Sequence, residues 1–134
     1  MKKSKIGFWF VILTVIFATL ACSFSASTAK VTDAVMTSDE QGQNQTSVYG
    51  PTDDFYCIVN LANAPDDTKV NAVWTAIDAE GVDANTVILE KELVSGSDTL
   101  TFSLTNDNLW PSGKYKVDIQ LNGTTVKTVE FQVE

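Results

Sequence analysis

Two-residue alternation of apolar and polar side chains dominates the chain after Pro51. Residues 114–121 are the clearest case, with the sequence Lys-Tyr-Lys-Val-Asp-Ile-Gln-Leu. This alternation is typical of a β-strand that buries one face and exposes the other. Six segments have such alternating or apolar β-rich character: Phe55–Ala62, Val70–Asp78, Thr86–Val94, Thr99–Leu104, Lys114–Leu121 and Thr125–Val133.

Short polar connections separate these segments. Asn122-Gly123 lies between the last two segments and predicts an antiparallel hairpin, because both residues tolerate a positive φ. No segment has a sustained period of 3.6 residues, and no internal repeat or parallel βαβ arrangement is visible. The pattern therefore predicts an all-β fold, an antiparallel sandwich or barrel of six to seven strands.

Residues 23–52 have a different composition, rich in Ser, Thr, Ala, Gln, Asn and Asp. Residues 41–46 contain no apolar side chain at all. Such a stretch buries too little surface to offset the entropy of ordering. We therefore expect a disordered, flexible tether over residues 22–52, with a short helix around residues 31–36 as its one candidate element, and a folded domain over residues 53–134.

The first 22 residues form an export signal. Three lysines precede an apolar run over residues 6–21, and Cys22 follows Ala21. The run is shorter than the roughly 20 residues that cross a bilayer as a helix. Thr19-Leu20-Ala21-Cys22 resembles the lipobox of bacterial lipoproteins, which implies a signal peptide over residues 1–21 and acylation of Cys22. The alternatives are simple secretion, with cleavage after Ala21 or Ala29, and an uncleaved membrane anchor.

Charge narrows the range of partners. The chain has 17 acidic residues, no arginine and no histidine. Residues 22–134 keep six lysines against all 17 acids, a formal charge of −11. Because phosphate contacts are built from Lys and Arg, nucleic acid is excluded as a partner.

Three residues in the predicted strands resemble the immunoglobulin-like β-sandwich. Cys57, Trp74 and Tyr115 match the strand B cysteine, the buried strand C tryptophan and the strand F tyrosine of that fold. Val117 stands where the second cysteine would be, so the resemblance implies a fold without the inter-sheet disulfide. The implied core consists of Cys57, Val59, Leu61, Trp74, Leu100, Phe102, Leu104, Tyr115, Val117, Ile119, Phe131 and Val133.

Catalysis has little support in this sequence. Without histidine there is no Ser-His or Cys-His nucleophile and no ordinary proton shuttle at neutral pH. The carboxylate pairs at 53–54 and 66–67 lie in turn segments, where aspartate is favoured for local hydrogen bonding. Cys57 lies on the predicted inward face and is expected to be a buried, inert thiol. We expect a protein that is not an enzyme.

Acidic side chains near three predicted connections are a candidate calcium site, since calcium takes six to eight oxygen ligands. Trp110 is expected to cover the core beside Tyr115, with exposure of Trp110 and Tyr56 for protein or carbohydrate contact as the alternative. The candidate ligands, called the carboxylate rim below, are Asp53, Asp54, Asp78, Glu80, Asp83 and Asp107, with the amide of Asn108.

Together these features favour binding over chemistry. We expect a lipid-anchored protein of the bacterial cell envelope, outside the cytoplasm, that acts as an adhesive or binding module for another envelope or extracellular protein. Such modules use a sheet face, a loop set or an edge strand. The alternatives are an inhibitor of an exported proteinase and a calcium-dependent extracellular module.

Overall fold

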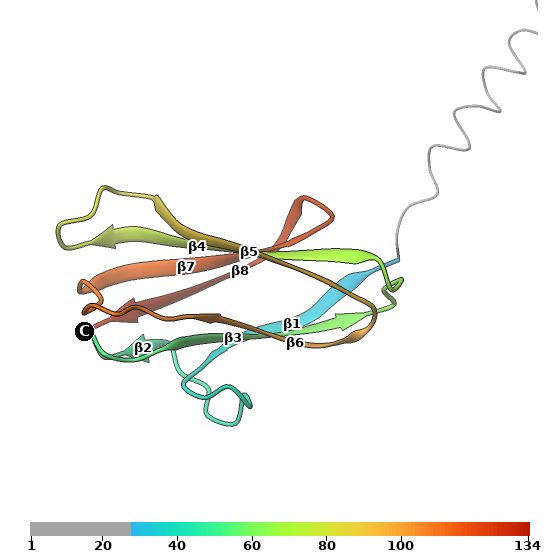
Figure 1. Cartoon of the computed structure of the whole chain (residues 1–134), viewed down its shortest axis with the longest axis horizontal. Helices are drawn as coiled ribbons and strands as arrows, with labels where there is room; N and C mark the ends of the chain where they lie inside the picture. Colours follow the sequence, from blue (N-terminus) through green and yellow to red (C-terminus); the bar gives the residue numbers. More distant parts are fainter. Residues whose placement is uncertain (1–27) are drawn as a thin grey trace, which may run out of the picture.

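All six predicted segments form strands in the computed structural model, which describes residues 28–134 (Figure 1). Two further strands precede them, and no helix occurs among the described residues. The strands are β1 (Lys30–Thr37), β2 (Val48–Tyr49), β3 (Phe55–Ala62), β4 (Thr68–Ala79), β5 (Thr86–Ser95), β6 (Asp98–Leu104), β7 (Gly113–Leu121) and β8 (Thr124–Val133).

The strands form two sheets that face each other. One sheet has the order β1-β3-β6 and the other the order β2-β8-β7-β4-β5. Neighbouring strands are antiparallel except β2, which runs parallel to β8. The predicted β7–β8 hairpin is confirmed, and its turn residues Asn122 and Gly123 have φ values of 47° and 88°. The predicted antiparallel sandwich is therefore confirmed.

The predicted tether is wrong from Lys30 onward. β1 pairs with β3 from Lys30 opposite Ala62 to Thr37 opposite Tyr56, so the proposed helix at 31–36 is a strand. β2 joins the second sheet beside the end of β8. The folded domain therefore begins before residue 53. Residues 22–27 lie outside the described residues.

A few deeply buried side chains order this polar segment. Ala34 and Met36 of β1 enter the core, and Tyr49 of β2 is 2% exposed. The phenol of Tyr49 donates a hydrogen bond of 2.7 Å to the carbonyl of Thr37, which ties β2 to the end of β1. A bulge between Val31 and Asp33 interrupts the alternation of β1, so its pattern is weak in the sequence.

The predicted core is confirmed at all twelve positions, each of which is buried. Trp74 lies opposite Val117 across the β4–β7 ladder, and Cys57 is a free, buried cysteine. The phenol of Tyr115 donates a hydrogen bond to the carbonyl of Pro111. A tyrosine at this place in immunoglobulin-like domains bonds in the same way to the backbone a few residues upstream.

Phe55 is the centre of an aromatic cluster between the sheets. Its ring centroid lies 4.6 Å from that of Trp110, and 4.8 Å from those of both Tyr49 and Phe131. Trp74 and Tyr115 complete the cluster, at 6.5 and 6.0 Å from Phe55. These separations lie in the range in which aromatic pairs add stability beyond the area they bury.

Replacing Trp74 by alanine should unfold much of the protein or lower its melting temperature by well over 10 °C. Truncating a buried tryptophan costs about 3 to 5 kcal/mol, at about 4 to 8 °C per kcal/mol in a domain of this size. The indole nitrogen of Trp74 is buried without a hydrogen-bond partner, so Trp74→Phe should cost much less, about 1 to 2 kcal/mol. Thermal melting measures both.

Lys116→Ala is the surface control for Trp74. Lys116 makes a partly exposed ion pair with Asp118, so its loss should cost no more than about 1 kcal/mol. Equal, small shifts for Trp74→Ala and Lys116→Ala would contradict the core assignment.

Removing β1 and β2 should destabilise the sandwich. A chain that begins at residue 53 loses the buried side chains of Met36 and Tyr49, and each large apolar side chain contributes about 1.5 to 3 kcal/mol. We expect a melting temperature more than 10 °C below that of a chain beginning at residue 28, at about 4 to 8 °C per kcal/mol. Identical melting curves for the two chains would mean that residues 28–52 are not part of the folded unit.

Candidate functional site

Cys57 has the environment of a structural thiol. Its side chain is fully buried, and this burial raises the pKa of the thiol to about 12. A nucleophilic cysteine needs a lowered pKa and access to solvent. The prediction of an inert thiol is therefore confirmed, and Cys57, Trp74, Tyr115 and Val117 together form core rather than a reactive centre.

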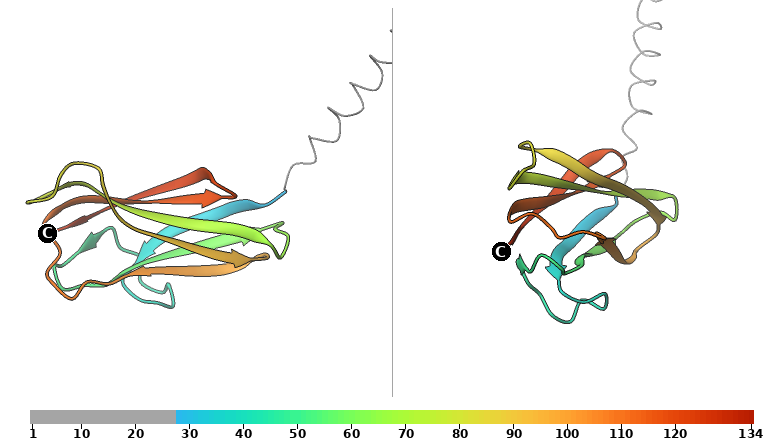
Figure 2. Two further views of the ribbon diagram at one scale, coloured as in Figure 1. Left: turned by 45° about the horizontal axis from the view of Figure 1, so that its top comes forward. Right: turned by 60° about the vertical axis from the view of Figure 1, so that its left-hand side comes forward.

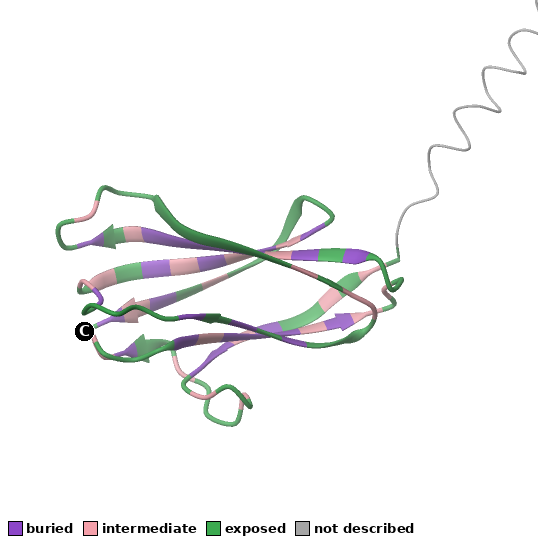
Figure 3. Ribbon diagram, viewed as in Figure 1, coloured by how far each residue is buried: buried purple, intermediate pink, exposed green. Residues whose placement is uncertain are grey.

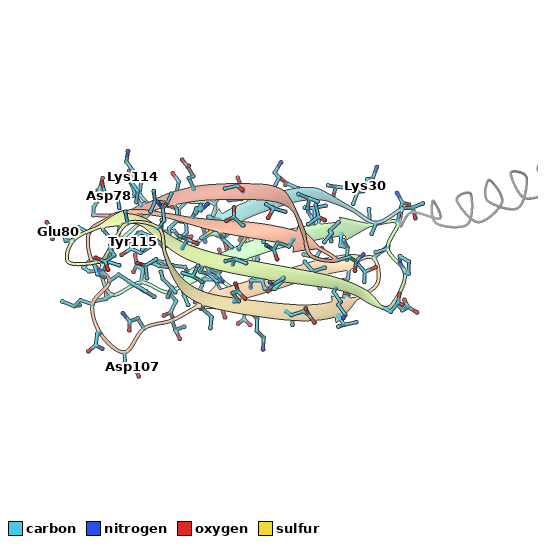
Figure 4. All side chains as sticks on the ribbon, turned by 90° about the horizontal axis from the view of Figure 1, so that it is seen from above. Lys30, Asp78, Glu80, Asp107, Lys114 and Tyr115 are labelled. Atoms are coloured by element: carbon cyan, nitrogen blue, oxygen red, sulfur yellow. The ribbon has the colours of Figure 1, made fainter. Side chains whose placement is uncertain are left out.

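Carboxylates of the predicted rim lie towards one end of the sandwich but do not converge. Figure 4 shows Asp78, Glu80 and Asp107 at the end opposite Lys30, with Asp107 apart from the other two. Among residues 28–134, no three side chains of the His, Cys, Asp or Glu type are placed to hold a metal ion. The predicted calcium site is therefore wrong.

Local hydrogen bonding and pairing explain why the rim does not form. The carboxylate of Asp53 accepts a hydrogen bond of 2.7 Å from the amide of Gly50, which closes the turn before β3. Asp78 lies opposite Lys114 in the β4–β7 ladder. Glu80 and Asp83 belong to the β4–β5 connection, Asp107 and Asn108 belong to the β6–β7 connection, and Asp54 is exposed before β3.

Trp110 covers the core, as predicted. Its side chain is 8% exposed. Its backbone amide donates to the carbonyl of Pro51 at 2.9 Å, and its indole nitrogen donates to the carbonyl of Asp53 at 2.9 Å. Trp110 therefore joins the β6–β7 connection to the start of β3. Tyr56 is half-buried on β3.

The polar loop after β1 is ordered by one carboxylate. Asp39 accepts hydrogen bonds from the amides of Gln43 and Asn44 at 2.9 and 2.8 Å, and these bonds hold its pKa below 3.8. Gly42, with φ of 74°, lies against Ile58 of the three-stranded sheet. Aspartate followed by glycine three residues later is a turn signal that could have indicated this loop.

A groove of about 400 Å³ lies between β1 and β8. It is lined by residues 34–36 of β1, by residues 45–47 and by Val129 and Glu130 of β8. Glu130 is its one titratable side chain, so the groove has no acid–base pair and no nucleophile–base pair of the kind that catalysis uses.

β5 is the most unusual surface of the molecule. It is an edge strand of the five-stranded sheet and is exposed along nearly its whole length (Figure 3). Seven large apolar side chains are exposed among the described residues, and four of them lie on β5. Their exposed fractions are 53% for Val87, 36% for Ile88, 41% for Leu89 and 59% for Val94.

Sequence reasoning predicted β5 as a strand but missed its exposure. The signal was present, because Val87-Ile88-Leu89 breaks the two-residue alternation. Three consecutive exposed apolar residues cannot all be explained by one buried face, and they mark a functional surface or an aggregation hazard. An edge strand also leaves a row of backbone amides and carbonyls unpaired on its outer side.

Residues 28–134 include no helix with the length and apolar character that crossing a membrane requires.

Comparisons with known proteins identify the fold and no family. No family model matches this sequence, and no curated protein matches it. An immunoglobulin-like protein from Pseudomonas aeruginosa is similar in structure, with 12% sequence identity, a TM-score of 0.55 and coverage of 82% of this chain and 99% of that one.

Parts of two larger proteins are also similar. Against the alkylpurine DNA glycosylase AlkC of Pseudomonas fluorescens, bound to DNA, the TM-score is 0.53 at 17% identity, covering 81% of this chain. Against a mutant β-glucosidase of Listeria innocua in complex with laminaribiose, the TM-score is 0.51 at 14% identity, covering 83% of this chain. The matches span only 31% and 17% of those two proteins. Likeness at such identity shows the fold alone: an immunoglobulin-like β-sandwich.

Asp39 should titrate below its ordinary pKa. Because the folded-state pKa is lowered by the bonds from Gln43 and Asn44, the ordered loop is favoured above pH 3.8 and is lost as the pH falls through the folded value. NMR chemical shifts of the two amides should follow this titration, and Asp39→Asn should abolish it. A midpoint at or above 3.8 would contradict the assignment.

Proposed function

We propose that this protein is a lipid-anchored module of the bacterial cell envelope that binds another protein through the open edge of β5. The observation that carries the proposal is the run Val87-Ile88-Leu89, exposed on a strand with one unpaired side. Addition of a strand from a partner to such an edge is a known mode of recognition, in which the main chain gives affinity and the side chains give specificity.

The anchor in this proposal is supported by the sequence at Cys22, which lies outside the described residues. β1 begins at Lys30, eight residues after Cys22. Eight extended residues reach at most about 29 Å. An acylated Cys22 would therefore hold the sandwich near the membrane surface.

The direction of the strands supports one orientation of the domain on such an anchor. β1 begins at the end of the sandwich opposite to Asp78, Glu80 and the C-terminus (Figures 1, 2 and 4). That opposite end would point away from the membrane. β5 has ten residues, about 33 Å of strand, and runs between the two ends. A partner in the envelope would find its edge along the side of the domain.

Several observations favour binding over catalysis. The chain has no histidine, Cys57 is buried and the rim carboxylates do not converge. The DNA-bound state belongs to the glycosylase and the laminaribiose complex to the β-glucosidase. The formal charge of −11 over residues 22–134 opposes contact with a DNA backbone.

Photo-crosslinking in cells that make the full chain tests the proposal. A photoreactive residue at Val87 should capture a partner protein, and the same residue at Val126, exposed at 46% on β8, should not. Cys22→Ala should remove acyl labelling and release the protein from the membrane fraction. Equal capture at both positions would exclude β5 as the binding edge. Acyl labelling that persists in Cys22→Ala would exclude Cys22 as the anchor.

A further inference from the structure

The middle of β5 has three charges on alternating faces. Glu90 and Glu92 lie opposite Val73 and Asn71 in the β4–β5 ladder, and Lys91 lies opposite Ala72. Ala72 is buried in the core, and directly opposite residues share a face. Lys91 therefore stands on the inner side of the sheet, and the two glutamates stand on its outer side.

These three charges have no charged partner within the described chain. The ion pair found in residues 28–134 joins Lys116 to Asp118, and all three side chains of the triplet are exposed. A strand added to β5 would place its side chains about 4.5 to 5.5 Å from those of β5, measured between opposite Cβ atoms. The triplet can therefore discriminate between partner strands.

A second copy of this chain fits the edge poorly. Two-fold antiparallel pairing centred on Lys91 sets Lys91 opposite its own copy and each Glu90 opposite a Glu92. Centring on Glu90 or on Glu92 sets that glutamate opposite itself. Like charges directly opposite each other destabilise a sheet. Registers centred on Leu89 or Leu93 set all three charges opposite uncharged residues.

Two features of β5 hinder its pairing with β5 of a second copy. Natural edge strands avoid indiscriminate pairing through inward-pointing charges and bulges. Lys91 is such a charge, and the β4–β5 ladder has a bulge between Trp74 and Thr75. The run Val87–Leu89 nevertheless stays exposed, so the edge offers apolar contact to any strand that satisfies the charges.

We propose that β5 selects a partner segment of defined charge: an extended strand with basic side chains opposite Glu90 and Glu92, an acidic side chain opposite Lys91, and apolar β-forming residues opposite 87–89. This inference rests on the proposed function and adds the chemistry of the partner. Selection arises because opposite charges across a pair of strands stabilise it and like charges destabilise it.

Two synthetic peptides test the selection on the full chain purified in detergent. The matching peptide is Val-Thr-Lys-Glu-Lys-Val-Ile-Val. Its antiparallel register sets Lys, Glu and Lys opposite residues 92, 91 and 90, and apolar residues opposite 89, 88 and 87. The reversed peptide, in which each charge has the opposite sign, is Val-Thr-Glu-Lys-Glu-Val-Ile-Val. Fluorescence anisotropy should show at least about tenfold tighter binding of the matching peptide, corresponding to about 1.4 kcal/mol, and the preference should shrink in 0.5 M salt.

Charge reversal in the protein supplies the matched control. The double variant Glu90→Lys and Glu92→Lys should prefer the reversed peptide. Glu130→Lys reverses the charge of an exposed glutamate on β8, away from the proposed binding edge. This variant should still prefer the matching peptide. Glu90, Glu92 and Glu130 are exposed, so both variants should fold like the wild-type chain. Melting curves check that they do.

The outcomes separate the two proposals. Equal binding of both peptides overturns the charge inference. So does a lack of binding by either peptide at about 1 mM, which means a binding free energy weaker than about −4 kcal/mol. Crosslinking at Val87 tests the binding edge independently. Sedimentation of the wild-type chain should show a monomer. A dimer that Val87→Lys abolishes would assign the edge to a second copy and overturn the inference.

Discussion

The packing of aromatic rings around Phe55 is the interaction on which the rest of the sandwich depends. Phe55 belongs to β3, and its ring neighbours come from β2, β4, β7, β8 and the β6–β7 connection. One cluster therefore joins both sheets and one end loop. Immunoglobulin-like domains with a disulfide divide this role between the disulfide and the buried tryptophan. Here no disulfide joins the sheets, because Val117 replaces the second cysteine.

This arrangement separates the stable part of the molecule from its candidate binding surface. β4 contributes Val70, Ala72, Trp74 and Ala76 to the core, whereas β5, its neighbour on the outside, contributes only the partly buried Leu93. β5 is consequently held mainly by its ladder with β4. Substitutions on β5 can alter recognition with little loss of core packing.

The sequence predicted the fold well where alternation is regular, and poorly where local geometry decides. The six strands follow from alternating or apolar β-rich segments, and the twelve core positions follow from the resemblance to the immunoglobulin-like fold. β1 was missed because its bulge breaks the period. The loop at Asp39 was missed because hydrogen bonds rather than apolar burial order it. The calcium site was predicted because the topology brings the carboxylates to one end of the fold. It does not form because turns and ladder partners set where each side chain points. The exposure of Val87–Leu89 could not be predicted without the sheet order, which makes β5 an edge strand.

The burial of Cys57 gives this domain a particular vulnerability. Burial raises the pKa of the Cys57 thiol to about 12 and keeps its sulfur from solvent, so this thiol is unreactive towards oxidants in the folded protein. Unfolding exposes the same sulfur at its ordinary reactivity. In an oxidising medium, mixed disulfides would then trap unfolded molecules. Disulfide exchange takes seconds to hours, whereas a small β-sandwich recloses within milliseconds to seconds. The working lifetime of the protein would therefore follow the equilibrium fraction of open molecules.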